Sequence, residues 1–218
     1  MSAAHDSRNF FLEGPAGRLE AILWTPSLVR APLSAVVCHP HPLFGGTMHN
    51  KVVYQAAKSL DALGLPVLRF NFRGAGLSAG EHAHGSGELD DVRAALDFLT
   101  AQFPGAPVLL AGFSFGAWVG LRVGCLDQRV SHLIGLGIPV NNTDFSFLRR
   151  CQKPKLFVHG SDDEFGAIAK VKALVDSLAG EKHLVEVQGV NHFFVGKLGE
   201  LDAAIRNWVS DNIVPIRH

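Results

Sequence analysis

Short apolar segments alternate with amphipathic segments along most of the chain. Six of the apolar segments are predicted strands, and several of these are nearly continuous runs, which is typical of strands buried on both faces of a sheet. The six segments cover residues 34–39, 66–72, 107–112, 132–138, 155–159 and 183–187. The alternation of these runs with helical patterns predicts an α/β fold: a mostly parallel central sheet with helices on both of its faces.

The predicted helices lie between these runs. Their apolar residues recur three and four positions apart, which gives each helix one buried face. The stripes extend from Val53 to Leu63, from Leu89 to Leu99, from Ile168 to Leu178 and from Leu201 to Val209. A further helix, rich in small residues, is expected from Phe115 onwards.

The start of the chain has a different pattern. Two apolar-rich runs, 9–13 and 18–25, flank Gly-Pro-Ala-Gly at 14–17, which predicts an antiparallel hairpin. No linker, repeat or low-complexity segment interrupts the chain. We therefore expect residues 1–218 to form a single domain, which at this length buries roughly 70% of its unfolded surface.

The composition excludes several classes of protein. Twenty basic residues balance 20 acidic ones, which argues against a nucleic-acid binder, because such proteins carry a basic excess. No apolar run approaches the roughly 20 residues that span a membrane. The first residues lack the basic start and apolar run of a secretory signal. Three cysteines without Cys-x-x-Cys spacing, Cys38, Cys125 and Cys151, are typical of reduced thiols, so we expect a cytoplasmic protein.

The motif Gly-x-Ser-x-Gly occurs twice, and its chemistry depends on its setting. Its serine is an exposed nucleophile only where the motif forms a sharp turn from a strand into a helix. Residues 112–116 meet this condition, since a strand leads directly into them and a helical pattern follows. Residues 76–80 do not, because three residues separate them from the preceding strand and a predicted loop, 81–87, follows. We therefore predict Ser114 as the nucleophile and not Ser78.

A nucleophilic serine needs a histidine to take its proton and an acid to orient that histidine. In this type of sheet the acid and then the histidine follow the serine, in loops at the carboxyl ends of strands. The loop after residue 159 holds three adjacent acids, and the loop after the last strand holds His192. We predict His192 as the base and Asp163 as the acid, with Asp162 second and Glu164 third.

The oxyanion hole requires backbone N–H donors. One comes from the residue after the nucleophile, Phe115, and the other from the loop after an earlier strand, here residues 39–46. The two prolines of this loop have no N–H. His41 is therefore the expected second donor, with Leu43 as the alternative.

Two pairs of histidines with i, i+2 spacing raise the alternative of a metal site. They are His39 with His41 and His82 with His84. A catalytic zinc site requires a third protein ligand, and nothing in the sequence indicates one. We expect no metal and no other cofactor, and we predict that these histidines have structural roles or border the pocket.

These segments together resemble the α/β-hydrolase superfamily, and most of all its small, lidless, dienelactone-hydrolase-like branch of predicted serine hydrolases. The resemblance covers the chain from Phe10 to Val209. It implies a three-layer fold, supports Asp163 as the end of His-Gly-x-x-Asp, and supports His41 at the third position of a His-Gly-x segment. Dienelactone hydrolases proper carry a cysteine where this chain has Ser114, so dienelactone is not the expected substrate. The matching segments are HPHPLFGGTM, NFRGAGLSAG, GFSFGAWVG, HGSDDEF and GVNHFF.

The connection in which related proteins carry a lid is short here. Residues 141–153 leave room for one short helix, so we expect an open site. Its substrate-binding wall is predicted to include Phe44, Phe113 and Phe193, with Phe115 and Phe194 as further candidates.

The predicted function is a serine hydrolase that cleaves small carboxylic esters or thioesters through an acyl-enzyme. The expected partner is a small-molecule substrate, with no nucleic acid and no membrane; the sequence does not indicate an oligomeric state. Two alternatives stay open. One is a peptidase or amidase with the same triad, and the other is a non-catalytic binding protein on a hydrolase scaffold.

Overall fold

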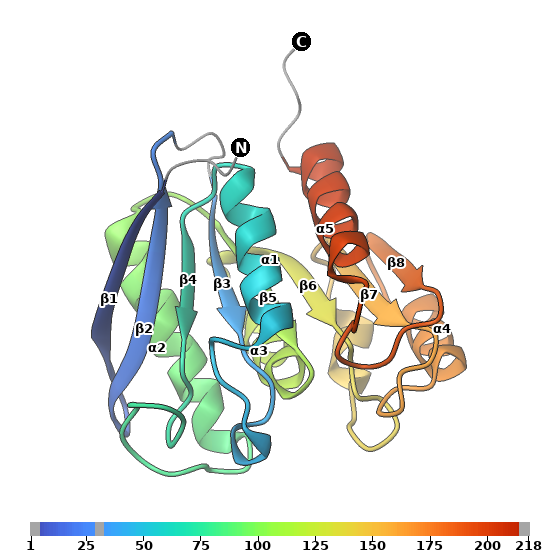
Figure 1. Ribbon diagram of the computed structural model, residues 1–218, viewed down its shortest axis with the longest axis horizontal. Coiled ribbons are helices and arrows are strands. Elements are labelled where there is room, and N and C mark those ends of the chain that lie inside the picture. Colours follow the sequence, from blue (N-terminus) through green and yellow to red (C-terminus); the bar gives the residue numbers. More distant parts are fainter. Residues whose placement is uncertain (1–4, 29–32, 214–218) are drawn as a thin grey trace.

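The computed structural model describes residues 5–28 and 33–213 and contains one eight-stranded sheet (Figure 1). The strand order is β1-β2-β4-β3-β5-β6-β7-β8. The strands β3 to β8 are parallel, whereas β1 and β2 form an antiparallel hairpin whose second strand pairs with β4. The strands are β1 (His5–Gly14), β2 (Gly17–Pro26), β3 (Ser34–Cys38), β4 (Val67–Phe70), β5 (Val108–Phe113), β6 (Val130–Leu136), β7 (Lys155–Gly160) and β8 (Lys182–Val187).

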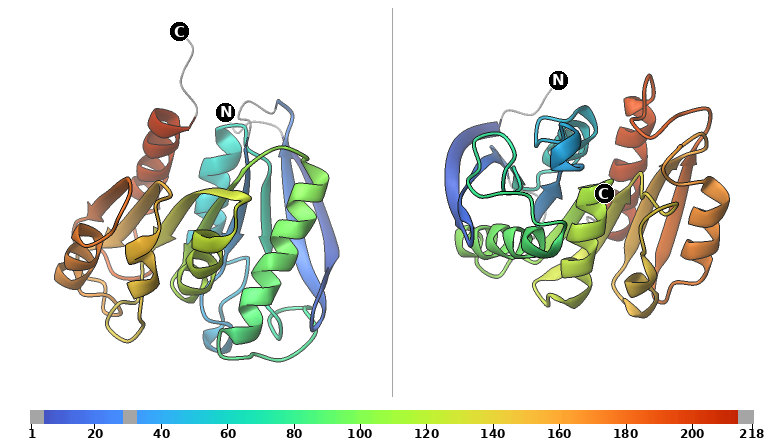
Figure 2. Two further views of the ribbon diagram at one scale, coloured as in Figure 1. Left: turned by 180° about the vertical axis from the view of Figure 1, so that it is seen from behind. Right: turned by 90° about the horizontal axis from the view of Figure 1, so that it is seen from below.

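Five α-helices cover the two faces of this sheet, which confirms the predicted three-layer fold class. Helices α1 and α5 share one face, and α2, α3 and α4 cover the other, as the view along the strands in Figure 2 shows. The helices are α1 (Lys51–Ala62), α2 (Ser86–Gln102), α3 (Phe115–Leu126), α4 (Ile168–Asp176) and α5 (Leu198–Asn212). The predicted loop 81–87 ends earlier than expected, because α2 already begins at Ser86.

Each face of the sheet has its own hydrophobic core. Val36, Leu110 and Leu133 point towards α2, α3 and α4, whereas the alternating residues Val37, Ala111 and Ile134 point towards α1 and α5. Because both faces are covered, strands such as β3 and β5 are buried along their whole length. This double burial explains why continuous apolar runs predicted these strands.

The opening hairpin is confirmed, but each of its strands is ten residues long and β1 begins at His5 instead of residue 9. Most of β1 is exposed at the edge of the sheet, and Leu12 is its buried apolar residue. An edge strand that buries so little has no strong apolar pattern, which is why its first residues gave no signal.

Because β3 to β8 run parallel, their carboxyl ends lie at one edge of the sheet, the lower edge in Figure 1. Cys38 at the end of β3 lies opposite Gly112, Phe113 lies opposite Leu136, and Gly160 lies opposite Val187. The loops that carry the predicted site residues all leave the sheet at this edge.

The connection between β6 and β7 holds only a short 3₁₀ helix, η2 (Ser146–Arg150), and no lid. The three cysteines of the chain are free thiols. Among the described residues, no helix has both the length and the apolar character needed to cross a bilayer.

Candidate active site

The structure brings Ser114, His192 and Asp163 together in one hydrogen-bonded chain. The Ser114 hydroxyl donates to His192 Nε2 over 2.9 Å, and His192 Nδ1 donates to Asp163 Oδ2 over 2.8 Å. His192 and Asp163 are buried, while Ser114 is partly accessible. The three residues come from the ends of β5, β8 and β7, so the shared sheet edge is what assembles them.

Ser114 lies in a sharp turn between β5 and α3, with φ of 55° and ψ of −120°. Side-chain-bearing residues rarely adopt such a positive φ. The flanking glycines allow the turn because there is no space for a Cβ at either position. A Cβ on Gly112 would lie 2.3 Å from the Gly116 carbonyl oxygen, and one on Gly116 would lie 2.4 Å from the His39 oxygen. The motif thus presents the hydroxyl at the end of the strand.

Asp163 is distinguished from its acidic neighbours by what its carboxylate contacts. Its Oδ1 accepts hydrogen bonds from the backbone N–H groups of Phe165 at 2.8 Å and Gly166 at 3.0 Å, which leaves Oδ2 for His192. Asp162 instead accepts a hydrogen bond from the Ser161 hydroxyl. Of the three acids considered, Asp163 is therefore the one aimed at the imidazole.

Glu164 contacts the same histidine in another way. Its Oε2 accepts the backbone N–H of His192 over 3.2 Å. The loop after β7 therefore holds both the side chain and the backbone of His192.

A second histidine, His159, lies beside the acid and was not predicted to take part in the site. It is fully buried, its Nε2 donates to the Gly166 carbonyl oxygen over 2.6 Å, and the same nitrogen lies 3.5 Å from Asp163 Oδ2. Burial lowers the pKa of His159, so the ring is neutral and holds the loop that supplies the two N–H donors to Asp163. Its position at the start of His-Gly-x-x-Asp is the signal that could have identified it.

Three phenylalanine rings surround the His192 imidazole. Phe165, Phe113 and Phe193 have ring centroids 4.7, 4.9 and 5.2 Å from it. Phe113 was predicted to line the substrate site, and this is wrong: it is fully buried on the α1 and α5 face of the sheet and supports His192 from beneath. Phe165, which no sequence pattern singled out, lines the pocket instead.

Of the two expected oxyanion donors, His41 lines the same cavity as Ser114, and Phe115 directly follows Ser114 in the chain. Phe115 is the first residue of α3, a position whose N–H has no partner within a helix. Within the described part of the chain, the backbone N–H groups of Phe115 and His41 make no hydrogen bond. The two side chains are in contact, with ring centroids 4.8 Å apart. Both N–H groups are therefore free to bind an oxyanion.

His39 holds the loop that carries His41. The His39 Nδ1 donates to the Pro40 carbonyl oxygen over 2.7 Å, and its Nε2 accepts the N–H of Phe72 over 2.9 Å. Complete burial lowers the pKa of His39 to about 3, which keeps the ring neutral with one donor and one acceptor. The pair of bonds ties the loop after β3 to the chain after β4.

A cavity of about 380 Å³ opens in front of Ser114. It contains the predicted wall residues Phe44 and Phe193, whereas Phe194 is buried and lines a neighbouring cavity. None of the described residues that line the first cavity is acidic. The lining consists of Pro40, His41, Phe44, Gly45, Gly46, Asn50, Ser114, Phe165, His192 and Phe193.

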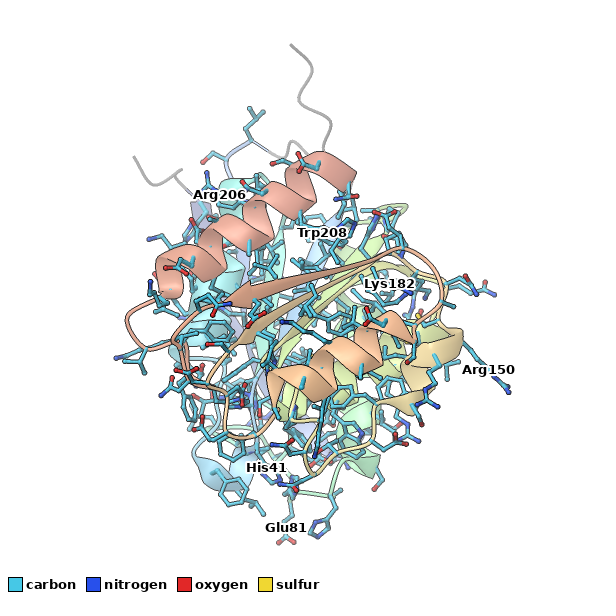
Figure 3. The ribbon with its side chains drawn as sticks, turned by 90° about the vertical axis from the view of Figure 1, so that its right-hand side faces the viewer. His41, Glu81, Arg150, Lys182, Arg206 and Trp208 are labelled. Atoms are coloured by element: carbon cyan, nitrogen blue, oxygen red, sulfur yellow. The ribbon has the colours of Figure 1, made fainter. Side chains whose placement is uncertain are left out.

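The second predicted histidine pair, His82 and His84, lies beside His41. The His82 ring lies 4.7 Å from His41 and 5.1 Å from His84, and His82 Nδ1 is 2.8 Å from the buried Glu88 carboxylate. Figure 3 shows His41 at the same end of the protein as Glu81, far from Trp208 on α5. In the described ranges, no three His, Cys, Asp or Glu side chains are arranged to hold a metal ion.

Comparison with known proteins identifies relatives of similar length. A family model described as "Serine aminopeptidase, S33" matches residues 32–140, which is half of the chain and includes His41, Ser114 and Phe115. A protein of Rickettsia prowazekii is 38% identical over 208 residues, covering 91% of this chain and 87% of that protein.

Two solved structures agree closely with the fold. An α/β serine hydrolase homologue from Coxiella burnetii has 40% identity and a TM-score of 0.88, covering 93% of this chain and 97% of the other. A lidless α/β serine hydrolase from Xanthomonas campestris has 38% identity and a TM-score of 0.89, covering 98% and 97%. The chain therefore belongs to the α/β-hydrolase superfamily.

Proposed function

We propose that the protein is a serine hydrolase that cleaves small carboxylic esters or thioesters, with Ser114 as nucleophile, His192 as base and Asp163 as orienting acid. The observation that carries the proposal is the continuous hydrogen-bonded chain from Ser114 Oγ to Asp163 at the wall of an open cavity. A serine hydroxyl at this distance from a neutral imidazole nitrogen is ready for proton transfer.

In the first half-reaction, Ser114 Oγ attacks the carbonyl carbon while its proton passes to His192 Nε2. The carbonyl oxygen becomes an oxyanion and accepts hydrogen bonds from the N–H groups of His41 and Phe115. The bond to the alcohol oxygen then breaks, and His192 Nε2–H gives its proton to that oxygen. Asp163 stabilises the imidazolium and holds its tautomer without taking the proton.

In the second half-reaction, water replaces the serine as nucleophile. His192 takes a proton from the water, the acyl group leaves Ser114 as the acid, and the serine oxygen recovers its proton. Each oxyanion donor is worth on the order of 10² to 10³ in rate in comparable sites. The two donors on this chain need no rearrangement, because His39 and the start of α3 already fix them.

The cavity supports a small substrate. Its walls are mainly Phe44, Phe165 and Phe193 with two glycines, and the connection between β6 and β7 supplies no lid to enclose a long chain. Apolar burial contributes about 0.8 kcal/mol per CH₂ only where a wall receives it. We therefore expect short acyl groups of roughly two to six carbons to be preferred over twelve and longer, because the favourable burial ends with the wall.

Covalent labelling tests the proposed nucleophile. A fluorophosphonate should label the protein once, and digestion should place the label on Ser114. A matched Ser78→Ala variant should label like the wild-type protein, whereas Ser114→Ala should not label. Labelling that survives Ser114→Ala, or no labelling of the wild-type protein, would contradict the proposal.

Amide cleavage is the second candidate, because the matched family model carries the name of an aminopeptidase. An aminopeptidase binds the ammonium group of its substrate, for which a carboxylate in the cavity is the natural partner. The described lining residues include none, which favours the ester. Comparison of kcat/KM for p-nitrophenyl esters with that for aminoacyl p-nitroanilides separates the two candidates.

A further inference from the structure

A second cavity, of about 530 Å³, lies next to the one in front of Ser114. Two described residues, Asn50 and Phe193, line both cavities and therefore stand between them. Besides the two shared residues, the second cavity has apolar walls from Val52, Phe194, Val195 and Leu198. Its other lining residues are Thr47, His49, Lys51 and Gly196. An apolar chain that passed between the two dividing residues would find further surface to bury.

The two dividing residues differ in how firmly they are held. Asn50 is the N-cap of α1, and its Oδ1 accepts the N–H of Val52 over 2.9 Å. Removing its side chain would therefore disturb the helix. Phe193 caps no helix, and the residue is 46% exposed. Its ring rests edge-on against His192 at 5.2 Å and near Phe113 at 6.1 Å, so the width of the passage depends on this ring.

The chemistry of the site indicates which part of an ester faces this passage. His192 Nε2 has to give its proton to the oxygen of the departing alcohol, so the alcohol lies on the imidazole side of the carbonyl carbon. Phe193 directly follows His192 in the chain and packs on the same ring. The second cavity therefore lies beyond the alcohol and not beyond the oxyanion donors His41 and Phe115.

We propose that Phe193 sets the size of the alcohol that the site accepts, and that the cavity behind it is a distal alcohol subsite closed by this ring. The inference rests on the proposed ester hydrolysis and deepens it. The substrate class is esters of small acids with short alcohols, because the Phe193 ring stops a longer alkyl chain at the boundary of the first cavity.

The test varies the alcohol while the acid stays constant. Hydrolysis of ethyl, butyl and octyl acetate is followed by pH-stat titration for the wild-type protein and for Phe193→Ala, Phe193→Leu and Phe193→Trp. The ratio of kcat/KM for octyl over ethyl acetate should rise at least tenfold in Phe193→Ala and by less in Phe193→Leu. A buried methylene is worth about fourfold in affinity, so a few newly buried groups suffice. Phe193→Trp should lower the butyl over ethyl ratio.

Phe165→Ala is the matched control. Phe165 also packs on His192, with ring centroids 4.7 Å apart, and lines the first cavity, but it does not border the second. An equal rise of the octyl over ethyl ratio in Phe165→Ala and Phe193→Ala would overturn the proposal. The proposal would also be overturned if Phe193→Ala raised kcat/KM for ethyl octanoate relative to ethyl acetate but not for octyl acetate. That result would place the acyl chain, and not the alcohol, behind Phe193. Wild-type protein that neither hydrolyses ethyl acetate nor reacts with a fluorophosphonate would instead overturn the proposed function itself.

Discussion

The two copies of Gly-x-Ser-x-Gly have the same spacing and entirely different surroundings. Ser78 lies in the loop between β4 and α2, where its hydroxyl donates to the Asn71 carbonyl oxygen over 2.7 Å and accepts the Glu20 N–H over 2.9 Å. Both bonds join the loop to neighbouring backbone. A hydroxyl used in this way is a structural cross-link and has no base beside it.

Ser114 has the opposite arrangement. Its backbone is held at a φ of 55°, and its hydroxyl bonds to an imidazole that a buried carboxylate orients. The glycines of the two motifs also differ in what surrounds them. A Cβ on Gly76 would meet the side chains of Asn71 and Glu20, whereas one on Gly116 would meet the backbone of β3 and its following loop. A five-residue motif therefore has catalytic meaning only when the strand before it and the helix after it create the turn.

The largest expected effect is the difference in kcat between the Ser114→Ala and Ser78→Ala variants. Ser114→Ala should lower kcat for p-nitrophenyl acetate by at least 10⁴ and by as much as about 10⁶, because the nucleophile is lost. Circular dichroism and thermal unfolding should show an intact fold. Ser78→Ala should stay within about threefold of wild type, since its hydroxyl bonds only to backbone. Loss of activity in Ser78→Ala with retention in Ser114→Ala would reverse the assignment.

The next effect concerns the acid. Asp163→Asn should lower kcat on the order of 10⁴, because an amide nitrogen facing Nδ1 favours the wrong tautomer of His192. Asp162→Asn is the control, since its carboxylate bonds to Ser161, and it should stay within a few-fold of wild type. Similar modest losses in both variants would place the acid elsewhere, with Glu164 the next residue to test.

His39 connects the Ser114 site with the loop that carries Ser78. It bonds to Pro40, which directly precedes the expected oxyanion donor His41, and to Phe72, which lies at the start of the Ser78 loop. Its folded-state pKa of about 3 lies below the ordinary value of 6.5. The unfolded chain therefore binds this proton first as the pH falls. The contribution of neutral His39 to the free energy of unfolding is fully present above pH 6.5 and is lost as the pH falls towards 3. The slope of this loss approaches about 1.4 kcal/mol per pH unit.

The measurement compares denaturant unfolding of wild type and His39→Asn between pH 7 and pH 4. The variant should be less stable at pH 7. The dependence of its unfolding free energy on pH should be shallower by about 1.4 kcal/mol per pH unit, which corresponds to one proton. His41, His132 and His159 also have lowered pKa values through burial, so the variant keeps their part of the slope. An unchanged slope would show that His39 is not the neutral link between the two loops.

The smallest effect is the structural contribution of Ser78. Ser78→Ala removes both hydrogen bonds of the hydroxyl, to Asn71 and from Glu20. We expect a loss of about 1–2 kcal/mol in the free energy of unfolding with ester hydrolysis retained. Urea unfolding of this variant beside Ser78→Thr, which keeps a hydroxyl, checks whether the bonds cause the loss.

Much of the fold and the geometric core of the site followed from sequence patterns. The six parallel strands were visible as apolar runs, with ends shifted by a few residues, because most of them are buried on both faces; β8 is largely half-buried and has the weaker pattern. The setting of the serine motif pointed to Ser114, and the order of loops pointed to Asp163 and His192. These predictions depend on local chemistry and chain order, which the sequence states directly.

The walls of the pocket were decided by the tertiary structure. Phe113 was predicted to line it but is buried beneath His192, because its place at the end of β5 directs the ring to the face covered by α1 and α5. Phe165 lines the pocket where Phe113 was expected, because the hydrogen bonds of Asp163 and His159 hold the loop after β7 against the His192 imidazole.

Phe193 and Asn50 are 143 positions apart in the sequence, and they line the same two cavities only because the fold brings their loops together at the sheet edge. Chain order indicates which loops gather at that edge. The packing of helices and strands against both cores determines how far apart the loops stand and which side chains face the substrate, and no local pattern records that distance.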